Sequence, residues 1–156
     1  MTSDSFCLNF PFKDKLFVNV SIEDGVITGV EFSSSPCQSK VESKEAGKLM
    51  EDLSNYFEGY KTDFKGHSVE LDTTDFVERV LDEVRNIPYG ETVTYGELAS
   101  RLETAPRAIG QAMKRNPIPL VIPCHRVVSA KGLGGFSSGV DIKKELLRLE
   151  SSIEQE

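Results

Sequence analysis

The sequence predicts an α+β protein in two parts, residues 1–72 and residues 73–156. Apolar and polar residues alternate early in the chain, which indicates strands, whereas apolar residues recur at helical spacing through most of the second part. A chain of 156 residues is long enough for one or two small domains with a packed core. No apolar run approaches the roughly 18 residues that a membrane span needs, so we expect no membrane association.

The first part predicts a small antiparallel sheet and a helix. Residues 16–33 form a predicted β-hairpin, because apolar and polar residues alternate on both sides of Asp24-Gly25, a turn dipeptide. Apolar residues at helical spacing predict a helix over residues 42–57. The polar, glycine-bearing stretch at 58–72 is expected to link the two parts, with a short strand around 69–71.

The second part opens and closes with predicted helices. Thr74 is a suitable N-cap for a helix that Pro88 and Gly90 would stop. The last helix is expected at about 140–150, with Lys143 on its polar face.

Two shorter helices are predicted between these. One lies around residues 95–102, and another is expected to be capped by Thr104, with Pro106 in its first turn. Asn116-Pro117 should end the second, because a residue before proline disfavours the helical region. Since a strand-like run, "PLVI", follows, the pair is a candidate helix-turn-helix.

The second short helix has two opposed faces. Its predicted core face consists of Ala105, Ile109, Ala112 and Met113. The opposite face consists of Arg107, Gly110, Gln111 and Lys114. Two cations beside a bare glycine backbone would suit close approach to a DNA groove, with a long arginine able to reach the base stack. An ordinary solvated helix face with a tolerated glycine is the alternative.

The charge is unevenly distributed. The chain carries a net −7, yet residues 101–150 hold nine basic and four acidic side chains, a net +5, which leaves −12 elsewhere. A basic half on an acidic protein indicates a localised site for a polyanion, although a solvated surface could show the same asymmetry by chance.

The cysteines raise the question of a nucleophile. Three widely spaced cysteines, an odd number, indicate a reducing compartment rather than a disulfide framework. Cys124 stands beside His125 in "IPCHRVV", and cations at His125 and Arg126 are expected to lower its pKa. In an extended segment the two side chains would point to opposite faces, so a water molecule is expected to connect them. A buried, inert cysteine is the alternative, while zinc or redox chemistry would need further Cys and His residues at shorter spacing.

Four segments, in order, resemble the O6-alkylguanine-DNA alkyltransferases (methylated-DNA–protein-cysteine methyltransferases). They are "PYGETVTYGELA", "PRAIGQAMKRNP", "IPCHRVV" and "GGFSSGVDIKKELLRLE". The resemblance is close over about residues 73–150 and loose over 1–72. It implies a sheet-and-helix N-terminal domain, then a mainly helical, winged-helix-like domain with a helix-turn-helix. It also implies stoichiometric, irreversible alkyl transfer from O6-alkylguanine in DNA to a cysteine, with nucleotide flipping, minor-groove binding and no cofactor.

The resemblance assigns roles to individual residues. Cys124 is the implied acceptor, His125 its base through water, and Glu150 the carboxylate that orients the histidine. Asn116 would brace the active-site turn, and Tyr95 would help extrude the nucleotide and protonate the departing guanine. The implied DNA-binding residues are Tyr95, Gly96, Arg107, Ala108, Gly110, Gln111 and Lys114. The implied base-pocket residues are Pro119, Val127 and Ser137.

Two departures and two rival functions accompany this interpretation. Some relatives carry an N-terminal zinc site, and His67 could match one ligand, but the set around it is missing, so we expect no metal. Phe136 stands where a tyrosine is common. The rival functions are a helix-turn-helix module that recognises DNA without chemistry and a Cys-His hydrolase. We expect a monomer that acts on double-stranded DNA, in the cytoplasm if the source is prokaryotic and in the nucleus if it is eukaryotic.

Overall fold

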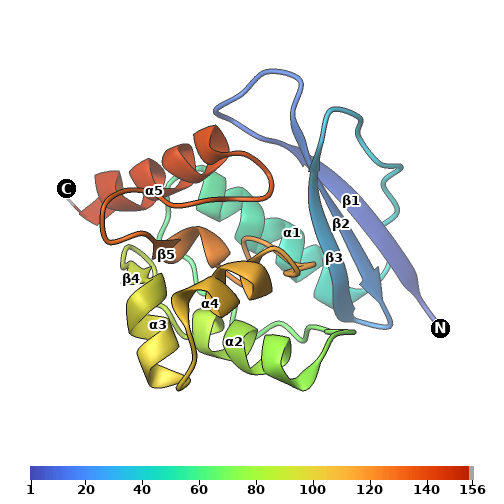
Figure 1. The fold of residues 1–156 in the computed structure, drawn as a ribbon. Helices are drawn as coiled ribbons and strands as arrows, with labels where there is room; N and C mark the ends of the chain where they lie inside the picture. Colours follow the sequence, from blue (N-terminus) through green and yellow to red (C-terminus); the bar gives the residue numbers. More distant parts are fainter. Residues whose placement is uncertain (155–156) are drawn as a thin grey trace. The chain divides into compact units, whose positions relative to one another are not determined.

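The computed structural model describes residues 1–154 and has a mixed α/β fold (Figure 1). The chain divides into two compact units between Leu71 and Asp72. No helix among the described residues is long and apolar enough to cross a membrane.

The first unit contains a three-stranded antiparallel sheet in the order β1-β2-β3 and one long helix. Its elements are β1 (Ser3–Asn9), β2 (Phe17–Glu23), β3 (Val26–Ser33) and α1 (Lys44–Phe57). The predicted hairpin and helix are therefore confirmed. Asp24 and Gly25 connect β2 to β3 with φ angles of 50° and 81°, which suits a tight hairpin turn.

Strand β1 was not predicted, and Asp4 explains why. Its carboxylate lies on the buried side of the strand, where the alternating pattern calls for an apolar residue. The same carboxylate accepts hydrogen bonds from the backbone N–H groups of Glu42, at 2.7 Å, and Ser43, immediately before α1. A hydrogen bond with the Ser43 side chain lowers the pKa of Asp4 most, and the backbone bonds from Glu42 and Ser43 lower it further. Asp4, the residue that interrupts the alternating pattern, therefore connects β1 to the start of α1.

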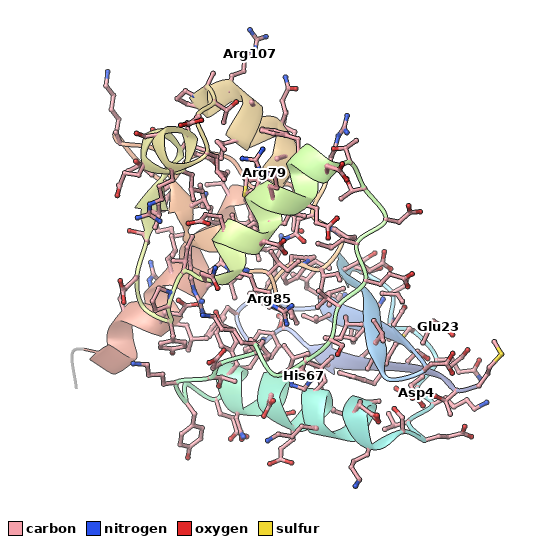
Figure 2. The ribbon with its side chains drawn as sticks, turned by 90° about the horizontal axis from the view of Figure 1, so that it is seen from below. Asp4, Glu23, His67, Arg79, Arg85 and Arg107 are labelled. Atoms are coloured by element: carbon pink, nitrogen blue, oxygen red, sulfur yellow. The ribbon has the colours of Figure 1, made fainter. Side chains whose placement is uncertain are left out.

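The link after α1 is less regular than expected. Val69 forms a single bridge with Ile27 rather than a strand. His67 Nε2 contacts Asp52 Oδ2 of α1 at 2.7 Å, and Figure 2 shows His67 beside that helix.

The second unit is mainly helical. Its helices are α2 (Asp75–Arg85), α3 (Tyr95–Arg101), α4 (Pro106–Met113) and α5 (Val140–Glu154). A short 3-10 helix, η1 (Cys124–Arg126), precedes β5 (Val127–Val128), which pairs in parallel with β4 (Val93–Thr94). The helices predicted in this part are confirmed, and Thr74 caps α2 as expected.

Two local predictions in this unit are wrong. The N-cap of α4 is Ala105 rather than Thr104, and Pro106 occupies the first turn. Because Pro106 restricts the residue before it to extended geometry, the helix begins one residue later than the capping pattern indicated. The "PLVI" run is a turn and not a strand: Leu120 has φ 75°, and Ile122 N–H donates to the Ile118 carbonyl at 2.9 Å.

The polar face predicted for α5 is also partly wrong. Lys143 is fully buried, whereas the apolar Val140 is 46% exposed. Val140 is the first residue of the helix, where a side chain need not face the interior. The burial of Lys143 could not be predicted from the helical spacing of apolar residues, because lysine was counted with the polar face.

Candidate functional site

Cys124 begins the η1 turn and borders a cavity of about 610 Å³. The sulfur-bearing residue is 8% exposed, so the thiol reaches the cavity while most of it is covered. The cavity is lined by Tyr95, Arg107, Gly110, Gln111, Met113, Lys114, Asn116, Pro119, Cys124, Gly135, Phe136, Ser137 and Ser138. Residues from α3, α4, the turn and the segment before α5 therefore meet around one thiol.

Asn116 holds the turn that carries Cys124. Its side-chain amide donates to the carbonyl of Ile122 at 3.0 Å, and its Oδ1 accepts from Ile118 N–H at 2.9 Å. These two bonds join both ends of the turn at residues 118–122, which contains the run that was predicted to be a strand. Asn116 also hydrogen-bonds the Cys124 side chain and lowers its pKa.

The thiol of Cys124 is harder to ionise than a free cysteine. Burial raises its pKa to about 11, and the Asn116 hydrogen bond and the charge of Lys143 only partly oppose that effect. The expectation of a lowered pKa for Cys124 is therefore wrong. Because the thiolate is the nucleophilic form of cysteine, this thiol could act as a nucleophile only with the help of a group that removes its proton.

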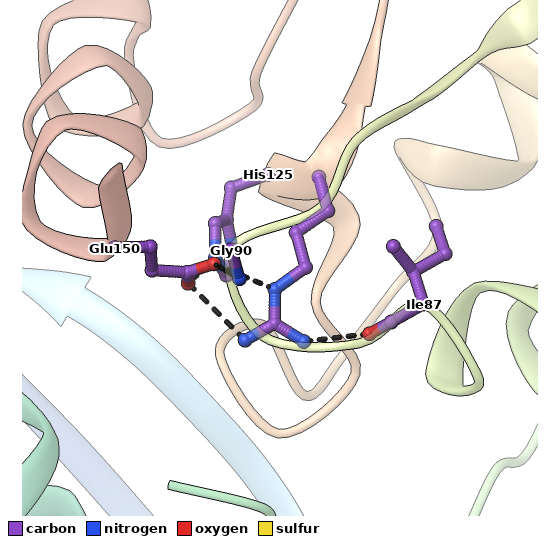
Figure 3. Close-up of polar contacts among 5 residues, drawn as sticks. Ile87, Gly90, His125 and Glu150 are labelled. Carbon is purple, nitrogen blue, oxygen red and sulfur yellow. Dashed lines mark hydrogen bonds and ion pairs between the residues drawn. The ribbon is translucent and has the colours of Figure 1, made fainter. Parts of the chain in front are cut away.

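His125 lies in a buried polar network that ends on α5 (Figure 3). Its Nε2 is 2.6 Å from Glu150 Oε2. Arg126 donates to both carboxylate oxygens of Glu150, at 2.9 and 3.2 Å, and to the Ile87 carbonyl at 2.7 Å. Gly90 N–H donates to the same carboxylate at 3.0 Å. Arg126 is thus engaged with Glu150, which is why it does not act on the thiol as predicted.

These contacts define the charges of the pair. Burial alone would raise the pKa of Glu150, but its hydrogen bonds with His125 and Arg126 and the charge of Arg126 outweigh burial and lower the pKa far below the ordinary range. Burial lowers the pKa of His125, against the opposing effect of Glu150. A neutral imidazole that donates through Nε2 to an ionised carboxylate keeps its other ring nitrogen as a proton acceptor.

The 3-10 geometry changes the expected relation between Cys124 and His125. Adjacent side chains on such a turn are not on opposite faces, as they are on a strand. The sequence pattern implied a strand because the run "PLVI" before them is apolar. The turn instead results from Leu120 and the Asn116 bonds described above.

Tyr95 stands at the first position of α3 and lines the same cavity. Thr94 and Glu97 form a reciprocal capping box that fixes the start of this helix. The Tyr95 hydroxyl donates to the Gly135 carbonyl at 3.4 Å, and burial raises its pKa, so it keeps its proton. Gly134, with φ 75°, allows this approach, because a Cβ there would lie 2.7 Å from the tyrosine ring.

The outer face of α4 borders the cavity as well. Arg107, Gly110, Gln111 and Lys114, predicted as one face, all line it. Arg107 and Lys114 are exposed, and Figure 2 shows Arg107 pointing away from the ribbon of its helix. A Cβ on Gly110 would meet open space, so this glycine leaves the helix backbone accessible.

Most of the site residues expected from the sequence come together here. Gly96 lies on a neighbouring hollow that also includes Tyr95, Arg107 and Gly110. Val127 does not line the cavity, and its carbonyl is bound by Lys143 at 2.6 Å. Sequence reasoning missed Gly135 and Ser138, for which the glycine-rich stretch at 132–139 was the available signal. It also missed Lys143, which lies beyond that stretch on α5. Within residues 1–154, no three His, Cys, Asp or Glu side chains are placed to hold a metal ion.

Comparison with known proteins supports a single family. Residues 75–152 match the family model described as 6-O-methylguanine DNA methyltransferase, DNA binding domain. A methylated-DNA–protein-cysteine methyltransferase of Metallosphaera sedula is 45% identical over 131 residues, 84% of each chain. Its namesake from Archaeoglobus fulgidus is 42% identical over 142 residues, 87% of this chain and 93% of the relative.

Solved structures agree over nearly the whole chain. The Mycobacterium tuberculosis O6-methylguanine methyltransferase is 30% identical, with a TM-score of 0.81, and covers 97% of this chain and 94% of its own. A structure of the M. tuberculosis protein in complex with DNA has a TM-score of 0.79 at 30% identity, over 96% of this chain and 93% of that one. With a matching family model, relatives above 40% identity and this fold, the chain belongs to the methylated-DNA–protein-cysteine methyltransferase family.

Proposed function

We propose that this protein repairs O6-alkylguanine in DNA by transferring the alkyl group, once and irreversibly, to Cys124. The observation that carries the proposal is the thiol of Cys124 at the edge of a cavity, with a tyrosine hydroxyl and a basic helix face on the same cavity. The named activity of the relatives supports the same conclusion.

His125 is the proposed base that generates the thiolate. Its imidazole is neutral and is oriented by Glu150, so it can take the Cys124 proton through one water molecule. Arg126 keeps Glu150 ionised, and Arg126 and the Gly90 N–H hold its carboxylate in place. Since burial holds the resting thiol protonated, we infer that the thiolate forms only once a lesion is bound.

Tyr95 is the proposed acid for the leaving guanine. The thiolate attacks the saturated carbon in line, the new C–S bond forms as the C–O bond breaks, and the electron pair leaves with the base. Protonation of the base by the Tyr95 hydroxyl improves the leaving group, and the tyrosine recovers the proton taken from Cys124. The sum is thiol plus alkylguanine giving thioether plus guanine, for which side chains suffice and no cofactor is needed.

The α3–α4 pair is the proposed helix-turn-helix of a winged-helix-like domain at residues 73–156, with residues 1–72 forming the N-terminal domain. Helix α4 would enter the minor groove through Ala108, Gly110, Gln111 and Lys114, while Arg107 fills the gap left by the flipped base. Flipping costs a few kcal/mol, which these contacts would offset. Pro119, Ser137 and the Val127 backbone are the proposed walls around the base, with Gly96 near the DNA backbone. One chain supplies every proposed residue, so we infer a monomer.

Intact-protein mass spectrometry tests the proposal. The protein is mixed with excess duplex that carries one O6-methylguanine. A gain of one methylene mass per chain, mapped to Cys124 and never exceeded, is expected, and Cys124→Ala should gain nothing while still binding the duplex. Tight lesion binding without any mass change in the wild-type protein would instead indicate a recognition module.

A further inference from the structure

Lys143 is a buried cation with no assigned part in the reaction. It projects from the first turns of α5 and its side chain is fully buried. Its ammonium donates to two backbone carbonyls, Val127 O at 2.6 Å and Gly135 O at 3.0 Å. Among the described residues no carboxylate forms an ion pair with it. Because a buried charge is costly without compensation, a lysine held in this way calls for a functional reason.

The two carbonyls belong to different segments of the chain, of which only the one with Gly135 lines the cavity. Val127 follows the turn that carries Cys124, and Gly135 belongs to the segment that lines the cavity with Phe136 and Ser137. The Gly135 carbonyl also accepts from the Tyr95 hydroxyl, and the Lys143 ammonium lies 5.8 Å from the centre of the Tyr95 ring. Lys143 therefore links three parts of the site. It binds the cavity-lining segment at Gly135 and β5 at Val127, and its ammonium lies over the ring of Tyr95.

The charges of Lys143 and Cys124 are coupled. Burial lowers the pKa of Lys143 to about 8, and negative charge on Cys124 opposes this decrease. Reciprocally, the ammonium lowers the pKa of the Cys124 thiol. Tyr95 and His125 also face this pair: burial raises the pKa of Tyr95 and lowers that of His125, in the latter case with help from the charges of Arg126 and Lys143.

We propose that Lys143 is a positioning residue of the transfer reaction, whose ammonium balances the charge of the Cys124 thiolate while the thiolate forms and attacks. The proposal rests on the function given above. It assigns to α5 two opposite tasks: Glu150 supplies the negative charge that orients His125, and Lys143 supplies the positive charge that the thiolate needs. When the thioether forms, the sulfur becomes neutral and the ammonium loses its counter-charge.

The decisive measurement is the ionisation of Cys124 itself. The rate at which iodoacetamide modifies Cys124 is followed against pH, with the Cys124 peptide resolved by mass spectrometry from those of Cys7 and Cys37. Three variants separate charge from structure. Lys143→Arg keeps the charge and the donors, Lys143→Gln keeps a donor without charge, and Lys143→Met keeps neither. Lys144→Met, at the exposed neighbouring position, is the matched control.

Loss of the charge should raise the apparent pKa of Cys124 by about one unit in Lys143→Gln and Lys143→Met, which slows modification about tenfold at neutral pH. Lys144→Met and Lys143→Arg should keep the wild-type rate at neutral pH. In the wild type the rate should cease to climb tenfold per pH unit above about pH 8, where Lys143 loses its proton, and this break should vanish in Lys143→Arg. Circular dichroism establishes which variants are folded.

Two results would overturn the inference: a wild-type thiol profile in folded Lys143→Gln, or folded Lys143→Arg as slow as Lys143→Met. If Lys143→Arg does not fold, the unchanged or raised pKa in Lys143→Gln decides alone. A parallel assay on O6-methylguanine duplex keeps the two proposals apart. Wild-type protein that transfers no methyl group refutes the proposed function but leaves the iodoacetamide profile valid. Wild-type transfer with unchanged thiol profiles refutes only the role of Lys143.

Discussion

Both histidines of the chain contact a carboxylate through Nε2, one in each unit, and the two pairs differ in almost everything else. His67 lies 2.7 Å from Asp52 in the first unit, and His125 lies 2.6 Å from Glu150 in the second. The first pair is partly exposed, with its side chains 11% and 14% accessible, whereas the second is 0% and 1% accessible.

The surroundings of the two pairs differ more than the distances. Asp52 also pairs with Lys48, an exposed lysine one turn earlier on α1, at 3.1 Å. Glu150 is held by the buried guanidinium of Arg126. His67 lies in a hollow lined by polar and charged side chains, while His125 follows a thiol. A histidine and a carboxylate in contact do not by themselves indicate catalysis; burial and the neighbouring nucleophile do.

The largest expected contrast is in alkyl transfer. Glu150→Gln removes the negative charge that orients His125, and we expect the rate of methyl transfer to Cys124 to fall by about a hundredfold or more. Asp52→Asn, the matched change in the other pair, should leave the rate unchanged. Single-turnover assays with O6-methylguanine duplex measure both. Equal losses in the two variants would mean that the pairs act alike and would break the comparison.

The second contrast is in stability. Arg126→Met leaves Glu150 buried without its guanidinium partner, and we expect the free energy of unfolding to fall by about 3 kcal/mol. Urea denaturation followed by circular dichroism gives the value. A loss well under 1 kcal/mol would show that Glu150 is compensated by His125 and Gly90 alone.

The third contrast is the pH dependence of stability. Burial lowers the pKa of His125 from its ordinary 6.5. The contribution of His125 to the free energy of unfolding is therefore complete above about pH 6.5 and decreases as the pH falls below that value. The pKa of Glu150 is also lowered, so its contribution is complete above its ordinary 4.5 and is lost below it. Each group adds a slope of up to about 1.4 kcal/mol per pH unit. Urea titrations across this range should show that the free energy of unfolding depends less on pH in Glu150→Gln than in the wild type below pH 4.5. Identical curves for the two proteins would contradict the lowered pKa of Glu150.

The smallest effect is expected for Lys48→Met. Its ion pair with Asp52 is exposed and spans one helical turn, where water and salt screen the attraction. We expect no measurable change in the urea midpoint, so this variant is also the control for Arg126→Met. A clear destabilisation would show that the partly exposed network around His67 matters more than its burial indicates.

Much of the fold was accessible from local sequence signals. Asp24-Gly25 predicted the hairpin, and Thr74 predicted the start of α2, because turn and cap preferences act over a few residues. The four segments that resemble the alkyltransferase family also predicted that Cys124, His125 and Glu150 form one site, since the order of these segments in the chain is distinctive. Strand β1 was missed because Asp4 interrupts the alternation for the sake of a contact with residues 38 and 39 positions away.

The sequence by itself determined the hairpin, the helices and the presence of a thiol beside a histidine, because each depends on neighbours along the chain. Only the tertiary structure decided the turn at Leu120, the engagement of Arg126 with Glu150 and the burial of Lys143 against Gly135. Those features depend on groups far apart in sequence, and a pKa depends on burial and on charges in space. The helical period of α5 therefore predicted that Lys143 faces solvent. The packing of the second unit instead buries its ammonium, where the positive charge lowers the pKa of Cys124.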